Sequence, residues 1–375
     1  MKNNANFHTE DELISQKKKR RLKITLGVLG GIIFVFVIFY FSWARPKLRE
    51  PISEPLTLPL VTLSAPDSPE VEQVAQSPEV QYPPVLPEAP VFHQPTHAPQ
   101  AKPVCGKDTE WIVLMVGIDY RGDGYLYGLA DSIRLIRIDF VNMTVNMVAL
   151  PRDLIVEAPE GRFTAPDPFK INQAYLFGTP GMGHYLGSGL GAGALSEVIY
   201  FNFGIPVDHY GVINFATLIN FIDAIDGVEI DLSSPVAGGY FGDFPSGTQT
   251  LNGERALALS MIREGYSDAF RVRNQTMIMR AALNKLIKPA YWLQVPVLLN
   301  EFGNSFLTDL SIEELTNLSV CFLRNFSREN LKTFEAPEGL LTGSSAFIPT
   351  LNNNAFVYLW DERFLDWMHN ALLQE

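Results

Sequence analysis

Residues 24–44 form an uncharged apolar stretch, ITLGVLGGIIFVFVIFYFSWA, which constrains the chain more than any other feature. Its length is about the 20 residues that a helix needs to cross the hydrocarbon core of a membrane. A cleaved signal peptide, the alternative, would have a shorter apolar core and a small-residue cleavage site. Here the stretch ends with Tyr40 and Trp43, which are typical of the membrane interface. We therefore predict a retained transmembrane helix over 24–44.

A basic segment, KKKRRLK at residues 17–23, directly precedes this stretch. By the positive-inside rule, residues 1–23 are a cytoplasmic tail and everything after Arg45 lies outside the cytoplasm. The predicted location is the cell membrane, with a single pass. The alternative, a nuclear-type or nucleic-acid patch, is disfavoured because the segment lies against the apolar stretch.

The rest of the chain is strongly acidic. The formal net charge of the whole chain is −12, and this total includes the positive charges of the basic segment, so the remainder is more negative still. An acidic domain repels polyanions, so the sequence predicts no nucleic-acid partner.

Proline defines the next segment, because 14 of the 26 prolines lie between Pro46 and Pro103. Such a composition favours extended polyproline-type backbone. We predict an extracytoplasmic linker over 45–104, followed by one domain over 105–375.

Within 105–375, strand and helix patterns alternate. This order predicts an α/β fold with a central mixed or parallel β-sheet flanked by helices on both faces. The expected strands are 111–117, 132–138, 144–150, 209–214, 227–232 and 331–336, and the expected helices are 193–203, 215–225, 253–262, 269–288, 311–325 and 361–374.

The two cysteines, Cys105 and Cys321, both lie on the predicted outer side. An oxidising compartment permits a disulfide between them. Spacing alone equally allows two buried thiols, and neither cysteine has the neighbours of a zinc site or a CxxC motif.

Two aspartates mark the ends of neighbouring predicted strands. Asp119 lies in GIDYR, directly after the strand 111–117, and Asp131 lies in LADSI, which opens the next strand. Two carboxylates at a sheet rim suit a hard divalent cation that leaves positions open for phosphate. The alternative is that each aspartate caps a turn or a helix start.

Arginines accompany the aspartates. Arg152 follows a proline in LPRDL, and Arg271 and Gln275 are four residues apart on one predicted helix face. Guanidinium groups bind phosphate oxygens in bidentate fashion, although surface ion pairs would explain the same residues.

Two other features are weaker candidates. The glycine-rich segment 187–194 could cradle an anion but more simply forms a flexible loop, and the apolar stretches over 291–326 could pack in a core or line a groove for a lipid tail.

Together these segments resemble the LytR–CpsA–Psr family of cell-envelope phosphotransferases. The resemblance extends from residue 112 to about residue 290. It rests on eight segments in order: GIDYR, ADSI, LPRDL, KINQAY, GIPVDHYGVINF, DGVEIDL, LNGERAL and SDAFRVRNQ. Members transfer a glycopolymer from a polyprenyl-pyrophosphate carrier to an acceptor such as peptidoglycan through a phosphodiester, with Mg²⁺ or Mn²⁺ as the cofactor.

The resemblance implies roles for particular residues. Asp119 and Asp131 match the metal-binding aspartates, and Asp119 or Asp153 is a candidate general base. Four arginines match catalytic positions that contact the phosphates in the family: Arg121, Arg152, Arg263 and Arg271. The positions implied to bind substrate are Asp153, Lys170, Asn172, Tyr175, Asp268, Arg273 and Gln275.

The chain departs from the family pattern at two positions. Met261 stands where the first arginine of an RxR motif is usual, and Asn274 stands where an arginine commonly precedes the glutamine. Loss of a charge-assisted phosphate contact costs about 1.5–3 kcal/mol. The alternatives to a transferase are therefore a non-catalytic module that binds lipid-linked glycans or regulates, and a hydrolase of the pyrophosphate lipid.

Overall fold

The computed structural model describes residues 39–56, 102–119, 127–262, 268–286, 288, 291 and 306–373. These residues belong to two units, one ending at Glu50 and one beginning at Pro51. In the first unit a π-helical turn, Tyr40–Ala44, leads into the short helix α2, Arg45–Arg49. The rest of the predicted transmembrane segment lies outside the described residues, and none of the helices that are described is long and apolar enough to cross a membrane.

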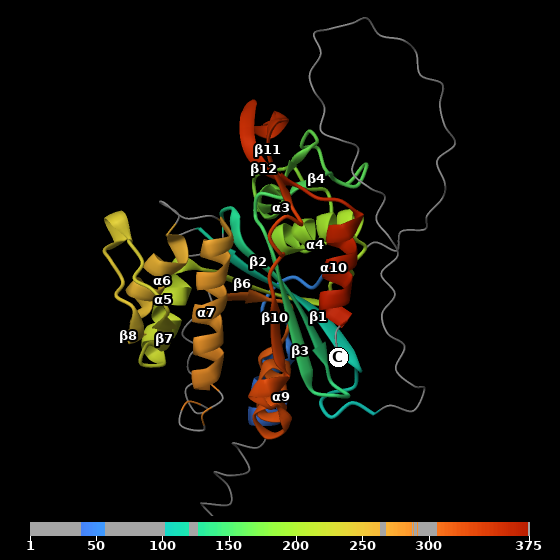
Figure 1. Ribbon diagram of the computed structural model, residues 1–375. Coiled ribbons are helices and arrows are strands. Elements are labelled where there is room, and N and C mark those ends of the chain that lie inside the picture. Colours follow the sequence, from blue (N-terminus) through green and yellow to red (C-terminus); the bar gives the residue numbers. More distant parts are fainter. Residues whose placement is uncertain are drawn as a thin grey trace, which may run out of the picture. The chain divides into compact units, whose positions relative to one another are not determined.

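A mixed sheet forms the centre of the second unit (Figure 1). In the described part of the chain its strand order is β10-β3-β2-β1-β6-β9. The β1–β6 and β10–β3 pairs are parallel, and the other neighbours are antiparallel. The strands are β1 Glu110–Ile118, β2 Ala130–Asp139, β3 Thr144–Leu150, β6 His209–Asn214, β9 Phe306–Thr308 and β10 Leu331–Phe334. The predicted α/β fold with a mixed sheet is confirmed.

Helices lie on both faces of this sheet (Figure 1). Alternation in β1 explains the two faces, since Ile112, Leu114 and Val116 are buried in the core beneath α3, α4 and α10, while Met115 points to the side of α5, α6 and α7. The helices are α3 Ile171–Phe177, α4 Leu190–Phe203, α5 Phe215–Ala224, α6 Gly253–Met261, α7 Asp268–Leu286, α9 Ile312–Asn325 and α10 Glu362–Leu373.

Three two-stranded ribbons complete the described elements. They are β4 Ile155–Val156 with β5 Phe169–Lys170, β7 Val228–Leu232 with β8 Gly247–Leu251, and β11 Thr342–Ile348 with β12 Asn353–Leu359. The sequence predicted β7 but not its partner, because β8 has the polar sequence GTQTL.

Part of the predicted linker is folded. Residues 51–53 pair with residues 308–311 at the end of β9, where the amides of Ile52 and Ser53 donate to the carbonyls of Leu310 and Thr308 over 3.3 and 2.8 Å. The Tyr210 hydroxyl donates to the Glu54 carbonyl over 2.8 Å. The second unit therefore includes the chain from Pro51 onward, and residues 57–101 of the linker lie outside the described residues.

The cysteine alternatives are resolved in favour of a disulfide. Cys105 and Cys321 are bonded, with their Cα atoms 5.9 Å apart. Cys105 packs in a small apolar cluster with Phe140 and Met143, at the start of the segment that leads into β1. The bond therefore ties that segment to α9.

The glycine-rich segment 187–194 is only in part the loop that we predicted. Helix α4 begins at Leu190, so the second half of the segment is helical. A Cβ at Gly191 would lie 2.7 Å from the Tyr175 carbonyl oxygen, and one at Gly193 would lie 2.0 Å from that of Ser188. Gly191 lets α4 pack closely on α3, and Gly193 leaves room for the loop that precedes α4, which accounts for both glycines without an anion.

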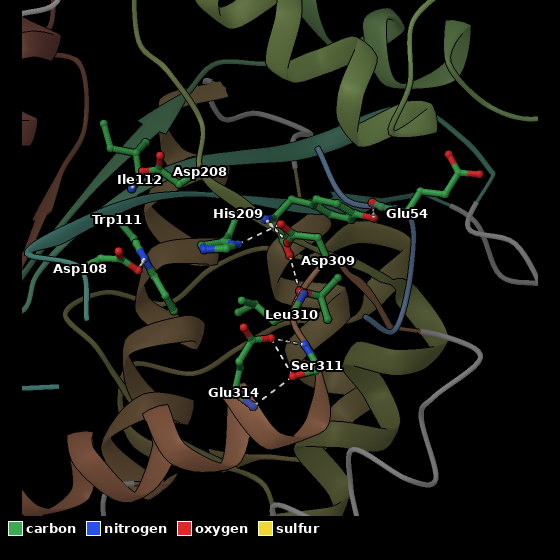
Figure 2. Close-up of polar contacts among 12 residues, drawn as sticks. Glu54, Asp108, Trp111, Ile112, Asp208, His209, Asp309, Leu310, Ser311 and Glu314 are labelled. Atoms are coloured by element: carbon green, nitrogen blue, oxygen red, sulfur yellow. Dashed lines mark hydrogen bonds and ion pairs between the residues drawn. The ribbon is translucent and has the colours of Figure 1, made fainter. Parts of the chain in front are cut away.

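A cluster of polar side chains lies where β6 begins (Figure 2). This end of the sheet is the one away from Ile118 of β1 and Asn214 of β6, which are paired. The His209 Nδ1 is 2.9 Å from a carboxylate oxygen of Asp309, whose other oxygen accepts from the Tyr210 amide. Burial lowers the pKa of His209, but the Asp309 hydrogen bond and the charges of Asp309, Asp208 and Glu314 outweigh burial and raise it. The cluster thus joins β6 to the segment between β9 and α9.

We expect the His209–Asp309 pair to stabilise the fold in a pH-dependent way. Because the folded-state pKa is raised above 6.5, the contribution is fully present below about pH 6.5 and is lost as pH rises through the folded-state value. His209→Gln should lower the unfolding free energy by about 1 kcal/mol at pH 5.5, which is the size expected for an ion pair that keeps some contact with water. The loss should be smaller at pH 8. Urea titrations of both proteins at the two pH values measure this, and an equal cost at both would contradict it.

Candidate functional site

The two predicted metal aspartates flank one strand pair. Ile118 of β1 lies opposite Ala130 of β2 next to a register shift, so Asp119 and Asp131 both project from this rim. One oxygen of Asp119 accepts from the Leu129 amide over 3.0 Å, which is the capping role considered as the alternative. The other oxygen is not needed for that cap, so capping and ligand binding are compatible.

Arg152 joins this pair from the third strand. It follows the end of β3, and its guanidinium donates to Asp131 over 2.5 Å. Its Nε lies 3.5 Å from Asp153. The structure therefore places Asp119, Asp131 and Arg152 at one rim, although Arg152 is not among the residues that line the pocket beside it.

Helix α7 provides one wall of a pocket that the rim aspartates also line. Arg271 is buried, and Gln275, one turn later, is half-buried on the same face. Both line a pocket together with Asp119 and Asp131. The spacing of four residues predicted this shared face.

Arg134 is a pocket residue that sequence reasoning missed. It projects from β2 opposite Met115, is 3% exposed, and donates to the Val272 carbonyl over 3.3 Å and to Gln275 over 3.4 Å. Burial lowers its pKa to about 10, with the charge of Glu335 raising it and that of Arg271 lowering it. The available signal was a charged residue among Ile133, Leu135 and Ile136 in the middle of a strand, where a buried charge needs a partner.

The pocket has a volume of about 770 Å³ and changes character along its length. On α7 the lining residues pass from Arg271 and Gln275 to Ile278, Ala282 and Leu286. That path is about 22 Å at 1.5 Å per residue. The apolar part is closed by side chains of α5, α7 and the sheet: Met115, Ile136, Met147, Leu218, Phe221, Met279, Leu283 and Phe306.

The KINQAY segment contributes differently from what the resemblance implied. Lys170 donates to Asp153 over 2.8 Å, and the Asn172 amide donates to the Arg152 carbonyl over 3.3 Å. Asn172 and Tyr175 are both buried, Tyr175 in the main core. Asp153, Lys170, Asn172 and Tyr175 are not among the lining residues, so the segment supports the loop that carries Arg152.

The remaining predicted site residues are not brought into the pocket by the described structure. Arg273 is exposed on α7. Arg121 and Arg263 lie outside the described residues, as does the side chain of Asp268. Met261, which stands where the family usually has arginine, does line the pocket.

The donor set at the rim suits a divalent cation of the magnesium type. Mg²⁺ is commonly held by one or two carboxylates, with phosphate oxygens and water completing its coordination, and Asp119 and Asp131 supply two carboxylates. Among the described residues no group of three or more His, Cys, Asp or Glu side chains could hold a metal by itself. An ion held by these two carboxylates would keep other coordination positions for phosphate oxygens and water.

One family of known proteins matches most of the chain. The profile of the LytR–CpsA–Psr family matches residues 92–372. The polyisoprenyl-teichoic acid–peptidoglycan teichoic acid transferase TagU of Oceanobacillus iheyensis is 31% identical over 229 residues, which are 60% of this chain and 65% of that protein. The similarity thus spans about two thirds of the length of this relative.

Solved structures share the fold. The crystal structure of Bacillus subtilis TagV matches with a TM-score of 0.55 and 22% identity, over 71% of this chain and 97% of that one. A structure of TagT bound to LIIa-WTA matches with a TM-score of 0.54 and 19% identity, over 74% and 93% of the two chains. At these identities the likeness concerns the fold.

Proposed function

The chain belongs to the LytR–CpsA–Psr family, and on that premise we propose that it is a phosphotransferase that moves a glycopolymer from a polyprenyl-pyrophosphate carrier to a cell-wall acceptor. Peptidoglycan is the acceptor and teichoic acid the polymer class suggested by the name of the TagU relative. A predicted single membrane helix, with the domain outside the cytoplasm, would place the enzyme where both substrates are found.

One observation carries this proposal. A single pocket has aspartates and arginines at one end and only apolar side chains toward the other. A polyprenyl pyrophosphate has the same two parts, a doubly charged head and a long apolar tail. Burial of the tail is favourable by about 25 cal/mol per Å² of apolar surface, while the head is bound by charge.

The polar end suits phosphoryl transfer. A divalent cation, when held by Asp119 and Asp131, would supply positive charge to the pyrophosphate oxygens. Arg271 and Gln275 would orient the phosphates from α7. Catalysis of this type depends mainly on positioning and on neutralising charge in the transition state.

In the proposed reaction an acceptor hydroxyl attacks the glycan-side phosphorus. The bond from that phosphorus to the bridging oxygen breaks, polyprenyl phosphate leaves with the electron pair, and the acceptor oxygen becomes part of a phosphodiester. The hydroxyl proton passes to a base. Of the two candidates, Asp119 lines the pocket, whereas Asp153 is 7% exposed and bound to Lys170, which favours Asp119.

Purified full-length chain in detergent, with a polyprenyl-pyrophosphate-linked glycan, Mg²⁺ and a peptidoglycan fragment, tests the proposal. We expect release of polyprenyl phosphate that requires the metal and is lost in Asp119→Ala and Arg271→Ala. Tight donor binding without release would instead favour a non-catalytic binding module, and Met261 would be the first residue to examine.

The apolar part of the pocket gives a separate prediction. Ala282 is 7% exposed and lines the apolar part of the pocket, between Ile278 and Leu286 on α7. The tryptophan side chain of Ala282→Trp should occupy part of the space for the lipid tail. A long tail would then be crowded, and added bulk in a packed apolar site costs about 1–3 kcal/mol. We expect at least a tenfold lower kcat/KM for a long polyprenyl donor and little change for a ten-carbon donor.

Arg280→Trp is the matched control, since Arg280 is exposed on the same helix. It should leave use of both donors unchanged. Equal loss with long and short donors in Ala282→Trp would argue against a lipid site along α7.

A further inference from the structure

We propose that Arg134 binds the lipid-side phosphate of the donor and so neutralises the polyprenyl phosphate that leaves. This inference rests on the proposed function and adds a residue that the family resemblance did not indicate. It starts from a buried cation that the protein satisfies only in part.

Arg134 has little to compensate its charge. The side chain is 3% exposed, and its Nε has no hydrogen-bond partner within the described structure. The two hydrogen bonds assigned to its guanidinium, to Val272 and Gln275, are 3.3 and 3.4 Å long and have neutral acceptors. A buried guanidinium with weak neutral partners is costly unless an anion joins it.

Its charged neighbours act in opposite directions. Burial lowers the pKa of Arg134, the charge of Glu335 raises it through space, and the charge of Arg271 lowers it by a smaller amount. Glu335 forms no hydrogen bond with Arg134 in the described structure. Two guanidinium groups that face one pocket and repel each other are the arrangement that a phosphate would relieve.

The position of Arg134 identifies which phosphate it would bind. Ser132, Arg134 and Ile136 alternate along one face of β2 and all line the pocket. Ser132 is two residues nearer the rim than Arg134, and Ile136 is two residues nearer the apolar part. The contacts with Val272 and Gln275 place the Arg134 guanidinium beside the turn of α7 that carries Arg271 and Gln275, and the next lining residue along α7, Ile278, is apolar. The phosphate that remains attached to the lipid would lie at this polar turn, next to the apolar part.

Arg137 on the same strand provides a natural comparison. It is equally buried, at 2%, but forms a hydrogen bond of 2.9 Å with Glu110 and an ion pair with Asp139. It is not a pocket residue. Arg137 is therefore a structural arginine, and Arg134 differs from it because no carboxylate of the described residues is in hydrogen-bond contact with it.

The experiment compares Arg134→Met and Arg137→Met in the full-length chain. Binding is measured for geranylgeranyl pyrophosphate, geranylgeranyl monophosphate and geranylgeraniol, and Tm is measured without ligand. We expect Arg134→Met to weaken both phosphorylated lipids by about 10- to 100-fold, as for loss of a charge-assisted contact, with the alcohol unchanged. Its Tm should be equal to or above that of the wild type, because an incompletely paired buried charge has been removed.

Arg137→Met should show the opposite pattern, with a lower Tm and unchanged binding, because Glu110 loses its partner. Wild-type binding of both phosphorylated lipids by Arg134→Met would overturn the inference, as would an equal loss of the alcohol. If the wild type neither bound the phosphorylated lipids nor turned over the glycan donor, the proposed function itself would fail, which is a distinguishable result.

Arg134→Lys keeps the charge and provides a second variant should the methionine variant not fold. Since lysine lacks the bidentate fork, we expect a smaller loss of about 3- to 10-fold for both phosphorylated lipids. In the Arg134→Met/Met261→Arg double variant, recovery of phosphate binding would support the same conclusion. Met261 lines the pocket too, so its arginine variant would return a cation to the same space.

Discussion

Asp131→Asn is expected to lower transferase turnover by about two to three orders of magnitude, as for removal of one group that stabilises charge in a transition state. Asparagine has nearly the same shape and can still accept the hydrogen bond from Arg152. What it lacks is the negative charge that a divalent cation needs. The measurement is polyprenyl phosphate release over a range of Mg²⁺ concentrations, and we also expect more Mg²⁺ to be needed for half-maximal rate.

Asp139→Asn is the matched control, at the other end of the same strand. Asp139 accepts from the amides of Val141 and Asn142, a capping role that asparagine can take over. It should retain the wild-type rate. If Asp131→Asn kept a rate within about threefold of the wild type, the rim aspartates would not have the role proposed for them.

Removal of the disulfide should produce the largest loss of stability. Cys105 and Cys321 are 216 residues apart in sequence, and a cross-link across so long a segment limits the unfolded chain strongly. Loss of such a native bond typically costs about 2–5 kcal/mol. We expect the Cys105→Ser/Cys321→Ser variant to show a reduction of that size in unfolding free energy, measured by urea denaturation.

The same variant should keep its transferase rate at a temperature where it is folded. Cys105 precedes β1 at the end opposite Asp119, so the bond does not touch the pocket. Treating the wild type with a reductant before urea denaturation should reproduce the stability loss. A difference below about 1 kcal/mol would show that the bond constrains the fold little.

The position of the rim that carries Asp119, Asp131 and Arg152 could be predicted from the sequence because strand ends and short polar motifs coincide. GIDYR follows β1, ADSI opens β2 and LPRDL follows β3, and antiparallel pairing brings these three ends together. The four-residue spacing of Arg271 and Gln275 placed them on one face of α7. Local pattern was sufficient at these places because chain direction alone determines which ends meet.

Arg134 shows where that logic ends. Arg134 and Arg137 are similar in type and burial, and only the partners reveal that one is a structural ion pair and the other faces the pocket. Tyr175 is the reverse case, since it lies in a matching motif yet packs in the core. A motif match does not distinguish a residue that binds substrate from one that supports the loop.

Short elements were missed for a different reason. Helix α3 has 7 residues and strand β9 has 3, too few to show a period. The ribbon β11–β12 is rich in Ser and Asn, which have low strand propensity. Residues 51–56 belong to the proline-rich segment by composition, and only their pairing beside β9 shows that they are folded.

The central claim is that the pocket transfers a glycan phosphate to a hydroxyl acceptor. The most direct test is the reaction of the full-length chain in ¹⁸O-labelled water with a polyprenyl-pyrophosphate-linked glycan, Mg²⁺ and a peptidoglycan fragment, followed by mass spectrometry. Our account predicts equal amounts of polyprenyl phosphate and of an acceptor–phosphate–glycan product that carries no ¹⁸O. Free glycan phosphate containing ¹⁸O would identify a hydrolase, and an unchanged donor would identify a binding module, and either result would contradict the account.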